Sequence, residues 1–431
     1  PAPWGNEIRI GVLEALMAVF FSLIMLLSVL GGLAHIGREL KNSRKNLFFI
    51  LLDLLMSSLL ALIYTNDLFT AYVFIEINTI SACGLIMIKK EGRTYVSALR
   101  YMVMSLVGSS LFLIALTILY SITGQLLMSP AKEALAELVA AGEYEVPMLV
   151  IIALVTVGLG IKSGLYPFHT WIPDAYGYTT PAASAILSSL VSKGYLFLLI
   201  KIFYRVLDFE FVVSSQVVNL LFVLGIIGMI MGSWLAIKTR NIRRMAAFSS
   251  VAQIGYIYMG IGIGTTAGVV AALFHIISHG AMKSLLFISI SGLSEVSDDK
   301  SDFESLKGAG FRNKLAGVAY TVGAMSMIGM PLLTGFISKY LFASAATTAQ
   351  GKMVAAWIAL AISTILNTVY FMGSVLTIYH SVPAEQRKPH GMMPSGVESA
   401  ATVGLIALNV GLGVAATPVV QAIQTGLAMF G

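Results

Sequence analysis

Long apolar runs separated by short polar connections dominate the pattern of this chain. About a dozen runs approach the roughly 20 residues that a helix needs to cross a bilayer. They are continuously apolar, without period-two alternation, which excludes a transmembrane β-barrel. We therefore expect an all-α polytopic membrane protein with about twelve transmembrane helices, at residues 8–33, 47–65, 69–88, 98–123, 147–178, 181–204, 213–237, 242–263, 266–292, 314–349, 354–380 and 398–418.

Two of these spans are too long for one simple helix and contain proline. Span 147–178 holds Pro167 and Pro173, and span 314–349 holds Gly329, Pro331 and Gly335. Proline removes a backbone donor and clashes with the preceding turn, so we expect a break in each helix. Paired broken helices in inverted repeats point to an ion or substrate path. The alternative is that the prolines are ordinary kinks.

Each broken helix is the fourth span in a unit of five spans. Because five is an odd number, the second unit has the opposite orientation in the membrane from the first. This divides the chain into four parts. Residues 1–46 hold an N-terminal transmembrane helix and a basic cytoplasmic loop, and 47–212 form the first five-helix repeat. Residues 213–380 form the second, inverted repeat, and 381–431 hold a C-terminal transmembrane helix.

The composition agrees with a membrane protein, because 57% of the 431 residues are hydrophobic and only 11% are charged. Soluble domains carry about 25% charged residues. The net charge of +6 is interpreted as a topology signal and not as a nucleic-acid signal, since basic loops face the cytoplasm. That predicts a multi-pass protein of the inner (cell) membrane. The basic residues of the loops expected on that side are Arg38, Lys41, Arg44, Lys45, Lys89, Lys90, Arg93, Lys238, Arg240, Arg243, Arg244, Arg387 and Lys388.

Ionisable side chains inside apolar spans are costly, at about 2.5–3.5 kcal/mol each near the bilayer centre. Glu76 lies near the middle of the third span, and Lys162 lies at the end of an apolar run. We interpret them as a pair whose making and breaking switches the proton affinity of the lysine; a static ion pair is the alternative. Lys193 is a deeper relay candidate. Lys201 and Arg205, nearer the end of the same helix, are expected to extend to the interface.

The ninth span carries His275, His279 and Lys283 at positions i, i+4 and i+8. They share one helix face and extend about 12 Å along its axis. Two imidazoles and an amine can pass a proton, because histidine titrates near neutral pH. Metal ligation or a structural histidine pair are the alternatives, but no third ligand is evident. Lys339 follows the second break as the counterpart of Lys162, and all these lysines are expected to face the bundle interior.

The sequence contains no sign of a bound cofactor. It has no Walker motif, no dinucleotide-binding glycine motif between a strand and a helix, and no iron–sulfur or haem ligand set. The single cysteine, Cys83, lies in an apolar run and excludes a disulfide within the chain. We therefore expect no cofactor, no metal site and no catalytic residue in this chain.

Five ordered motifs carry a resemblance to a known family. PFHTWIPDAY, SAILSSLVSKGY, NIRRMAAFSSVAQIGY, FHIISHGAMKSLLF and GMPLLTGFISK resemble the antiporter-like subunits of respiratory complex I. They are equally similar to the related large subunits of Mrp-type sodium/proton antiporters and membrane-bound hydrogenases. The resemblance covers residues 47–380. The twelve spans align with family helices three to fourteen, so we expect the first two family helices and the long lateral C-terminal helix of some members to be missing.

The resemblance implies a fourteen-helix fold with two inverted five-helix repeats. It implies a half-channel built on Glu76, Lys162 and Lys193. It also implies a central hydrophilic axis through His275, His279 and Lys283. By the same resemblance, Lys339 is the exit-side lysine.

We therefore predict an ion-translocating subunit of a multisubunit membrane complex. It would move protons, sodium ions or both, coupled to a redox partner or to counter-ion flow. Expected partners are other membrane subunits, including iron–sulfur or hydrogenase-like subunits, and the lipid bilayer. A pump subunit of an oxidoreductase complex and an Mrp-type antiporter subunit both fit. The alternatives are a stand-alone secondary transporter of a small solute and a structural subunit with a vestigial polar axis.

Overall fold

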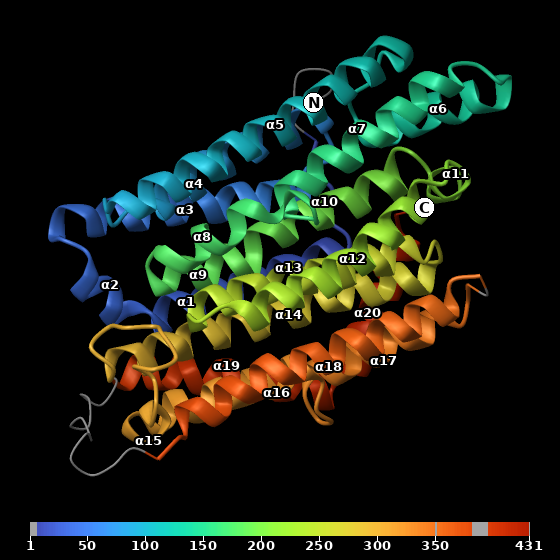
Figure 1. Cartoon of the computed structure of the whole chain (residues 1–431). Helices are drawn as coiled ribbons and strands as arrows, with labels where there is room; N and C mark the ends of the chain where they lie inside the picture. The colour runs from blue at the N-terminus through green and yellow to red at the C-terminus, as the bar shows by residue number, and fades with distance from the viewer. Residues whose placement is uncertain (1–6, 350, 382–394, 431) are drawn as a thin grey trace.

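The computed structural model describes residues 7–349, 351–381 and 395–430, which form one elongated bundle of helices (Figure 1). In the first half of the chain the helices are α1 (Val12–Gly31), α2 (Leu33–Glu39), α3 (Asn42–Tyr64), α4 (Leu68–Ile86), α5 (Gly92–Thr123), α6 (Met128–Ala141), α7 (Glu145–Ser163), η1 (Phe168–Trp171), α8 (Ile172–Tyr178), α9 (Pro181–Ile186), η2 (Leu187–Val191) and α10 (Ser192–Arg205). In the second half they are α11 (Phe209–Ser214), α12 (Val217–Lys238), α13 (Ile242–Gly262), α14 (Thr266–Glu295), α15 (Ala309–Arg312), α16 (Lys314–Ile328), α17 (Thr334–Ala346), α18 (Met353–Ile378), α19 (Gly396–Val414) and α20 (Ala416–Ala428).

The all-α polytopic prediction is confirmed. Within the described ranges, ten helical segments are long and apolar enough to cross a membrane, judged by length and composition. The two other expected spans correspond to α13, which is more polar, and to the short helices α16 and α17. The chain after residue 398 differs from the expectation of one helix. There α19 ends at Val414, and α20 follows as a separate helix with Pro418 in its first turn.

Both long proline-containing segments are interrupted. Helix α7 ends before Gly164, whose φ is +82°, and α16 ends before Gly329, whose φ is +96°. Such left-handed backbone favours glycine. Pro167 and Pro331 lie in the interruptions. Pro173 lies instead in the first turn of α8, where its fixed φ suits the start of a helix.

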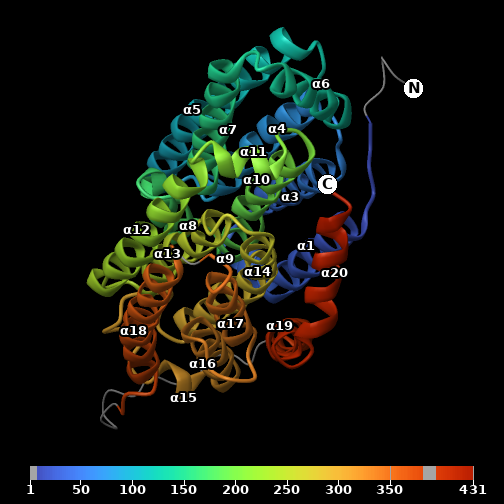
Figure 2. The same ribbon diagram turned by 90° about the vertical axis from the view of Figure 1, so that its right-hand side faces the viewer.

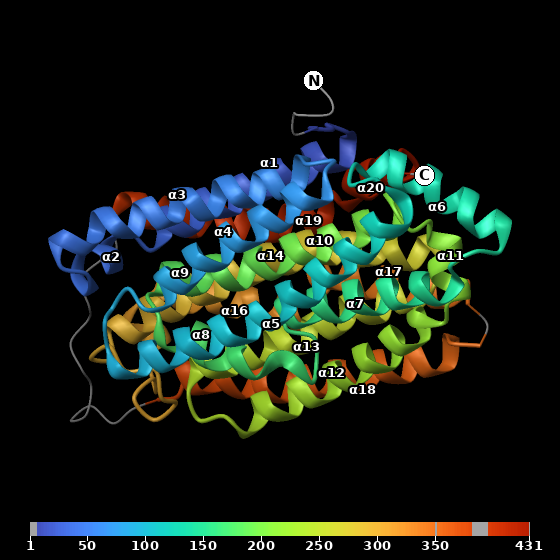
Figure 3. The same cartoon turned by 90° about the horizontal axis from the view of Figure 1, so that it is seen from above.

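Helix α14 runs through the middle of the molecule. Figure 2 shows it between the group that contains α3, α4, α5 and α7 and the group that contains α16, α17 and α18. Seen from above, α1 and α3 lie along one long edge and α12 and α18 along the opposite one (Figure 3). The most apolar windows of α14 and of the segment Pro181–Arg205 are completely buried. These two segments have no lipid-facing side, so every polar side chain on them must find its partner inside the protein.

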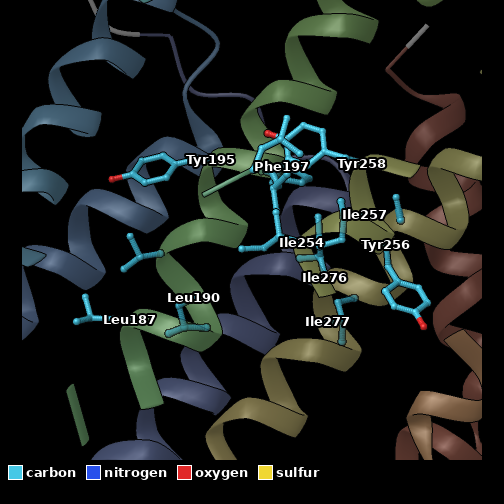
Figure 4. Packing of buried hydrophobic residues seen from close by; sticks show 14 of the residues in the cluster. Leu187, Leu190, Tyr195, Phe197, Ile254, Tyr256, Ile257, Tyr258, Ile276 and Ile277 are labelled. Atoms are coloured by element: carbon cyan, nitrogen blue, oxygen red, sulfur yellow. The ribbon is translucent and has the colours of Figure 1, made fainter. Parts of the chain in front are cut away.

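Apolar side chains seal the space between α10, α13 and α14 (Figure 4). Ile254 and Ile257 of α13 lie between Phe197 of α10 and Ile276 of α14. Tyr195 and Tyr256 point away from this cluster in opposite directions. The polar groups described next are therefore set in a closely packed core.

Candidate functional site

Glu76 on α4 and Lys162 on the last turn of α7 lie close together. Their Oε1 and Nζ atoms are 3.7 Å apart, which is an ion pair without a direct hydrogen bond. The Lys162 ammonium donates instead to Thr79 Oγ1 at 2.6 Å and lies 5.5 Å from the centre of the Tyr195 ring. The lysine side chain is fully buried, whereas that of Glu76 is 24% exposed. The pair thus joins an interior amine to a partly buried side chain whose interacting oxygen, Oε1, is itself buried.

Lys193 begins the next polar contact. It is completely buried on α10 and donates to the carbonyl of Ser188 in η2. The η2 segment is a single turn of π-helix, a feature that is frequent at functional sites. The Ser188 hydroxyl shares a hydrogen bond of 3.0 Å with Ser250 of α13. Lys193 is therefore tied to α13 through one serine.

His275, His279 and Lys283 line one face of α14. The two imidazole rings are stacked with their centres 5.6 Å apart and their planes 7° from parallel. Lys283 donates to the carbonyl of Ala246 at 2.5 Å and to the hydroxyl of Ser249. Neither ring nitrogen of His279 has a hydrogen-bond partner within the part of the chain that the structure describes.

Lys339 lies on α17, just beyond the second interruption. Its ammonium donates to the carbonyl of Ile328, the last residue of α16, at 2.6 Å and to Thr364 Oγ1 at 2.9 Å. The neighbouring Ser338 is hydrogen-bonded to His275 Nδ1 at 2.6 Å. Lys162 precedes its break and Lys339 follows its break, so the two lysines occupy opposite sides of matching interruptions.

The seven predicted side chains fall into two groups. Glu76 and Lys162 form the first. The second comprises Lys193, Lys283, His279, His275 and Lys339. Within it, Lys193 reaches Ser250 through Ser188, Ser250 and Lys283 share the carbonyl of Ala246, and the two imidazoles stack. In the described part of the chain no hydrogen bond joins His279 to Lys283 or Ser338 to Lys339. Among the described residues no hydrogen bond joins Lys162 to Lys193. We call the two groups together the polar row.

The linking hydroxyls were not among the predicted site residues. They are Thr79, Ser188, Ser249, Ser250, Ser338 and Thr364. The signal was present in the sequence, since serine pairs interrupt the apolar helices of SSLVSK and FSSVAQ. Serine is common in membrane helices, however, and only the packing reveals which hydroxyls meet an amine.

The expectation that Lys201 and Arg205 extend to the membrane interface is wrong. Both are buried. Lys201 donates to the carbonyl oxygens of Ile63 and Thr65 at 2.8 and 2.5 Å, and Arg205 pairs with Glu14 at 2.7 Å. The reason is that α10 is enclosed on all sides, so a side chain on it has no route to the headgroups. These residues bind α10 to α3 and α1.

Asp174 and His169, which lie near the first interruption, have contacts of their own. Asp174 pairs with Arg100 at 2.6 Å and with Arg244 at 3.2 Å. His169 stacks on Tyr166 with ring centres 5.0 Å apart. In the described ranges, no group of three or more His, Cys, Asp or Glu side chains is arranged to hold a metal ion.

Comparison with known proteins places these features in context. The family described as NADH:quinone oxidoreductase/Mrp antiporter, transmembrane, matches residues 65–367. NADH-quinone oxidoreductase subunit N of Desulforudis audaxviator is 33% identical over 428 residues, covering 96% of this chain and 82% of that protein. A Na⁺/H⁺ antiporter subunit of Alkalihalophilus pseudofirmus is 25% identical over 420 residues, covering 97% and 82%.

Two solved structures share the fold. A chain of the membrane-bound sulfane sulfur reductase, an archaeal respiratory membrane complex, superposes with a TM-score of 0.88 at 26% identity, covering all of this chain and 84% of that one. A chain of the Mrp complex from Dietzia sp. superposes with a TM-score of 0.87 at 24% identity, covering 99% and 85%.

Proposed function

The chain is an antiporter-like membrane protein that belongs to the NADH:quinone oxidoreductase/Mrp antiporter transmembrane family, and we propose that it translocates protons along the polar row within a multisubunit membrane complex. The observation that carries the proposal is the row itself, which sets buried lysines and histidines of α7, α10 and α14 between the partly buried Glu76 of α4 and Lys339 of α17. A buried amine in a membrane-spanning helix carries a cost that a role in transport explains. Their contacts favour transfer of charge between neighbours.

The Glu76–Lys162 pair acts as the switch. At 3.7 Å the carboxylate stabilises the ammonium form of Lys162, while the hydroxyl of Thr79 supports it whether or not Glu76 is near. Withdrawal or protonation of Glu76 leaves a buried cation with only a neutral partner, which favours release of its proton. The proton then passes to the second group, beginning at Lys193. The pair therefore converts a movement of charge at the surface of α4 into proton release inside the bundle.

The chemistry of the row favours protons over sodium. Lysine amines and histidine imidazoles bind and release protons, whereas sodium prefers oxygen ligands and is repelled by ammonium groups. Glu76 is the single carboxylate in the row. Sodium transport, where the complex carries it, would use other residues of this chain or other subunits.

The position of Glu76 also supports assembly with other membrane subunits. Its side chain is 24% exposed, although the Oε1 atom that faces Lys162 is buried, and an ionisable side chain that reaches the surface of the bundle is costly against lipid. A neighbouring subunit that covers this surface would remove that cost and act on the switch. An iron–sulfur or hydrogenase-like subunit elsewhere in the complex would supply the driving energy, since moving one charge against 100 mV needs about 2.3 kcal/mol.

The test is to purify the native complex, identify every subunit and reconstitute it in liposomes that contain a pH-sensitive dye. The drive is either a sodium gradient or the electron donor of a co-purifying redox subunit. We expect proton movement that requires the drive and is collapsed by a protonophore. A chain that purifies alone, moves no protons and shows saturable uptake of a solute would contradict the proposal.

A further inference from the structure

A second buried polar cluster lies at the end of α14, apart from the polar row. His35 on α2 is placed between Glu295, the last residue of α14, and Glu398 in the first turn of α19. His35 Nε2 is 3.7 Å from Glu295 Oε2, and Nδ1 is 4.0 Å from Glu398 Oε1. Three elements distant in sequence thus bring an imidazole between two carboxylates, at the same end of the bundle as the basic loops that begin at Arg38.

The imidazole is buried but leaves its nitrogens available. His35 is 7% exposed, and neither ring nitrogen has a hydrogen-bond partner among the residues described by the structure. It borders a cavity of about 30 Å³, which is large enough for a water molecule. The other polar groups that line this cavity are Ser289, Glu295, Asn313, Glu398 and Thr402. A polar cavity of this size is suited to hold water between the ring and the carboxylates.

The charges around His35 suit a group that passes protons on. The charged groups that act on it are Arg38 and Glu39 of α2, Glu295 of α14 and Glu398 of α19. Burial, followed by Arg38, lowers the pKa of His35, and the three carboxylates oppose this effect. The ring is therefore mainly neutral at pH 7. A neutral imidazole can take a proton on one nitrogen and release the proton of the other.

Hydroxyl side chains recur along α14 between the cavity, which Ser289 lines, and the polar row. Ser291 and Ser284 precede Glu295 by four and eleven residues, which places all three on one face of the helix. Ser291 Oγ is buried and has no hydrogen-bond partner in the described part of the chain. Ser284 Oγ is bonded at 2.6 Å to Ser28 Oγ of α1. Ser284 also follows Lys283 directly in the sequence, so this face reaches the level of the polar row.

We propose that His35, held between Glu295 and Glu398, is the proton-uptake residue that serves α14 from the basic end of the bundle. The inference rests on the proposed function, because it supplies the protons that the row transports. One proton from the basic end binds the unprotonated ring nitrogen, and the proton on the other nitrogen leaves to water in the cavity. The carboxylates stay ionised throughout and stabilise the short-lived imidazolium, and rotation of the neutral ring then returns its remaining N–H to the first position. One proton is gained and one is released, so no charge is left behind.

The experiment compares reconstituted native complexes that carry wild-type chain, His35→Ala, His35→Gln, Lys162→Met or His380→Ala. His380 is an exposed histidine after α18 and is the matched control. We expect both His35 variants to slow driven proton movement by at least about tenfold, and His380→Ala to match wild type. Added imidazole should restore proton movement in the His35→Ala complex, because it fills the vacated space and carries protons. It should not restore Lys162→Met.

Other results would overturn the inference. Wild-type rates in His35→Gln would show that the ring carries no protons. A loss in His35→Ala that imidazole does not restore, with a lowered melting temperature, would show a structural role only. If His35→Ala fails to assemble, His35→Gln decides alone, because glutamine keeps polarity and approximate size. Normal transport in Lys162→Met would count against the proposed function itself, which separates the two failures.

Discussion

At the scale of single residues, buried charges in this protein are held by neutral oxygens more often than by opposite charges. Within the polar row, Lys193, Lys283 and Lys339 all donate to backbone carbonyls. Glu14 and Arg205 are the contrasting case, a fully desolvated ion pair at 2.7 Å. A carbonyl partner leaves the amine free to change its charge, whereas removing one member of a buried ion pair costs about 3–5 kcal/mol. The first arrangement suits transport and the second suits architecture.

Ser249→Ala should slow proton movement, because it removes the side-chain acceptor of the Lys283 ammonium. A hydrogen bond to a charged group contributes about 1.5–3 kcal/mol, so the proton affinity of Lys283 should change by a comparable amount. The measurement is driven proton flux in liposomes at several pH values. Thr117→Ala is the control, since Thr117 is exposed and its hydroxyl donates to the carbonyl of Leu113 in its own helix. Equal proton flux in the Ser249→Ala and Thr117→Ala variants would show that Ser249 does not contribute to proton movement.

Acid should destabilise the wild-type protein more than the His35→Gln variant. Burial lowers the pKa of His35 in the folded state below the ordinary value of 6.5, so the unfolded chain binds more protons in acid. The stabilising contribution is complete above pH 6.5 and is lost as the pH falls through the folded-state pKa. Melting temperatures measured in detergent between pH 8 and 5 test this. A wild-type protein that gains stability over His35→Gln on acidification would contradict it.

At the scale of elements, each interruption of a helix lies beside a lysine. The end of α16 supplies the carbonyl of Ile328 to Lys339, and Gly329 lets the chain turn there with φ at +96°. A Cβ atom at Gly329 would lie 2.9 Å from Lys339 Cδ. The turn and the lysine therefore constrain each other. The sequence predicted the second break from Gly329, Pro331 and Gly335, whereas the first was predicted from its prolines alone and Gly164 was not assigned to the turn.

Gly329→Ala should displace Lys339 and destabilise the protein. A left-handed backbone costs a non-glycine residue about 1–2 kcal/mol, and the added methyl group crowds the Lys339 side chain. We expect a lower melting temperature and a reduced proton flux. Gly411→Ala is the matched control, because Gly411 lies within α19 with no atom within 4 Å of its added Cβ and alanine favours helix. A Gly329→Ala protein as stable and active as Gly411→Ala would refute this explanation of the turn.

At the scale of the whole molecule, the sequence predicted the helical class, the two interrupted segments and the residues of the polar row. Those features depend on hydropathy, proline and the cost of charge in lipid, which are local properties. The burial of α10 and the cluster at His35 depend on how the helices pack around one another. A local sequence pattern does not encode this packing. His35 lies in a short helix between two spans, where a histidine resembles an ordinary loop residue. Glu295 and Glu398 are 260 or more residues away in the chain.

The central claim, that protons pass through the polar row, is tested most directly by Lys162→Met in the reconstituted complex. Lys132→Met is the matched control, since Lys132 on α6 is partly exposed and lies outside the row. Both variants should assemble, because methionine fills the space of a lysine stem. We predict that Lys162→Met abolishes driven proton movement while Lys132→Met retains the wild-type rate. Proton movement at the wild-type rate in an assembled Lys162→Met complex would contradict the claim.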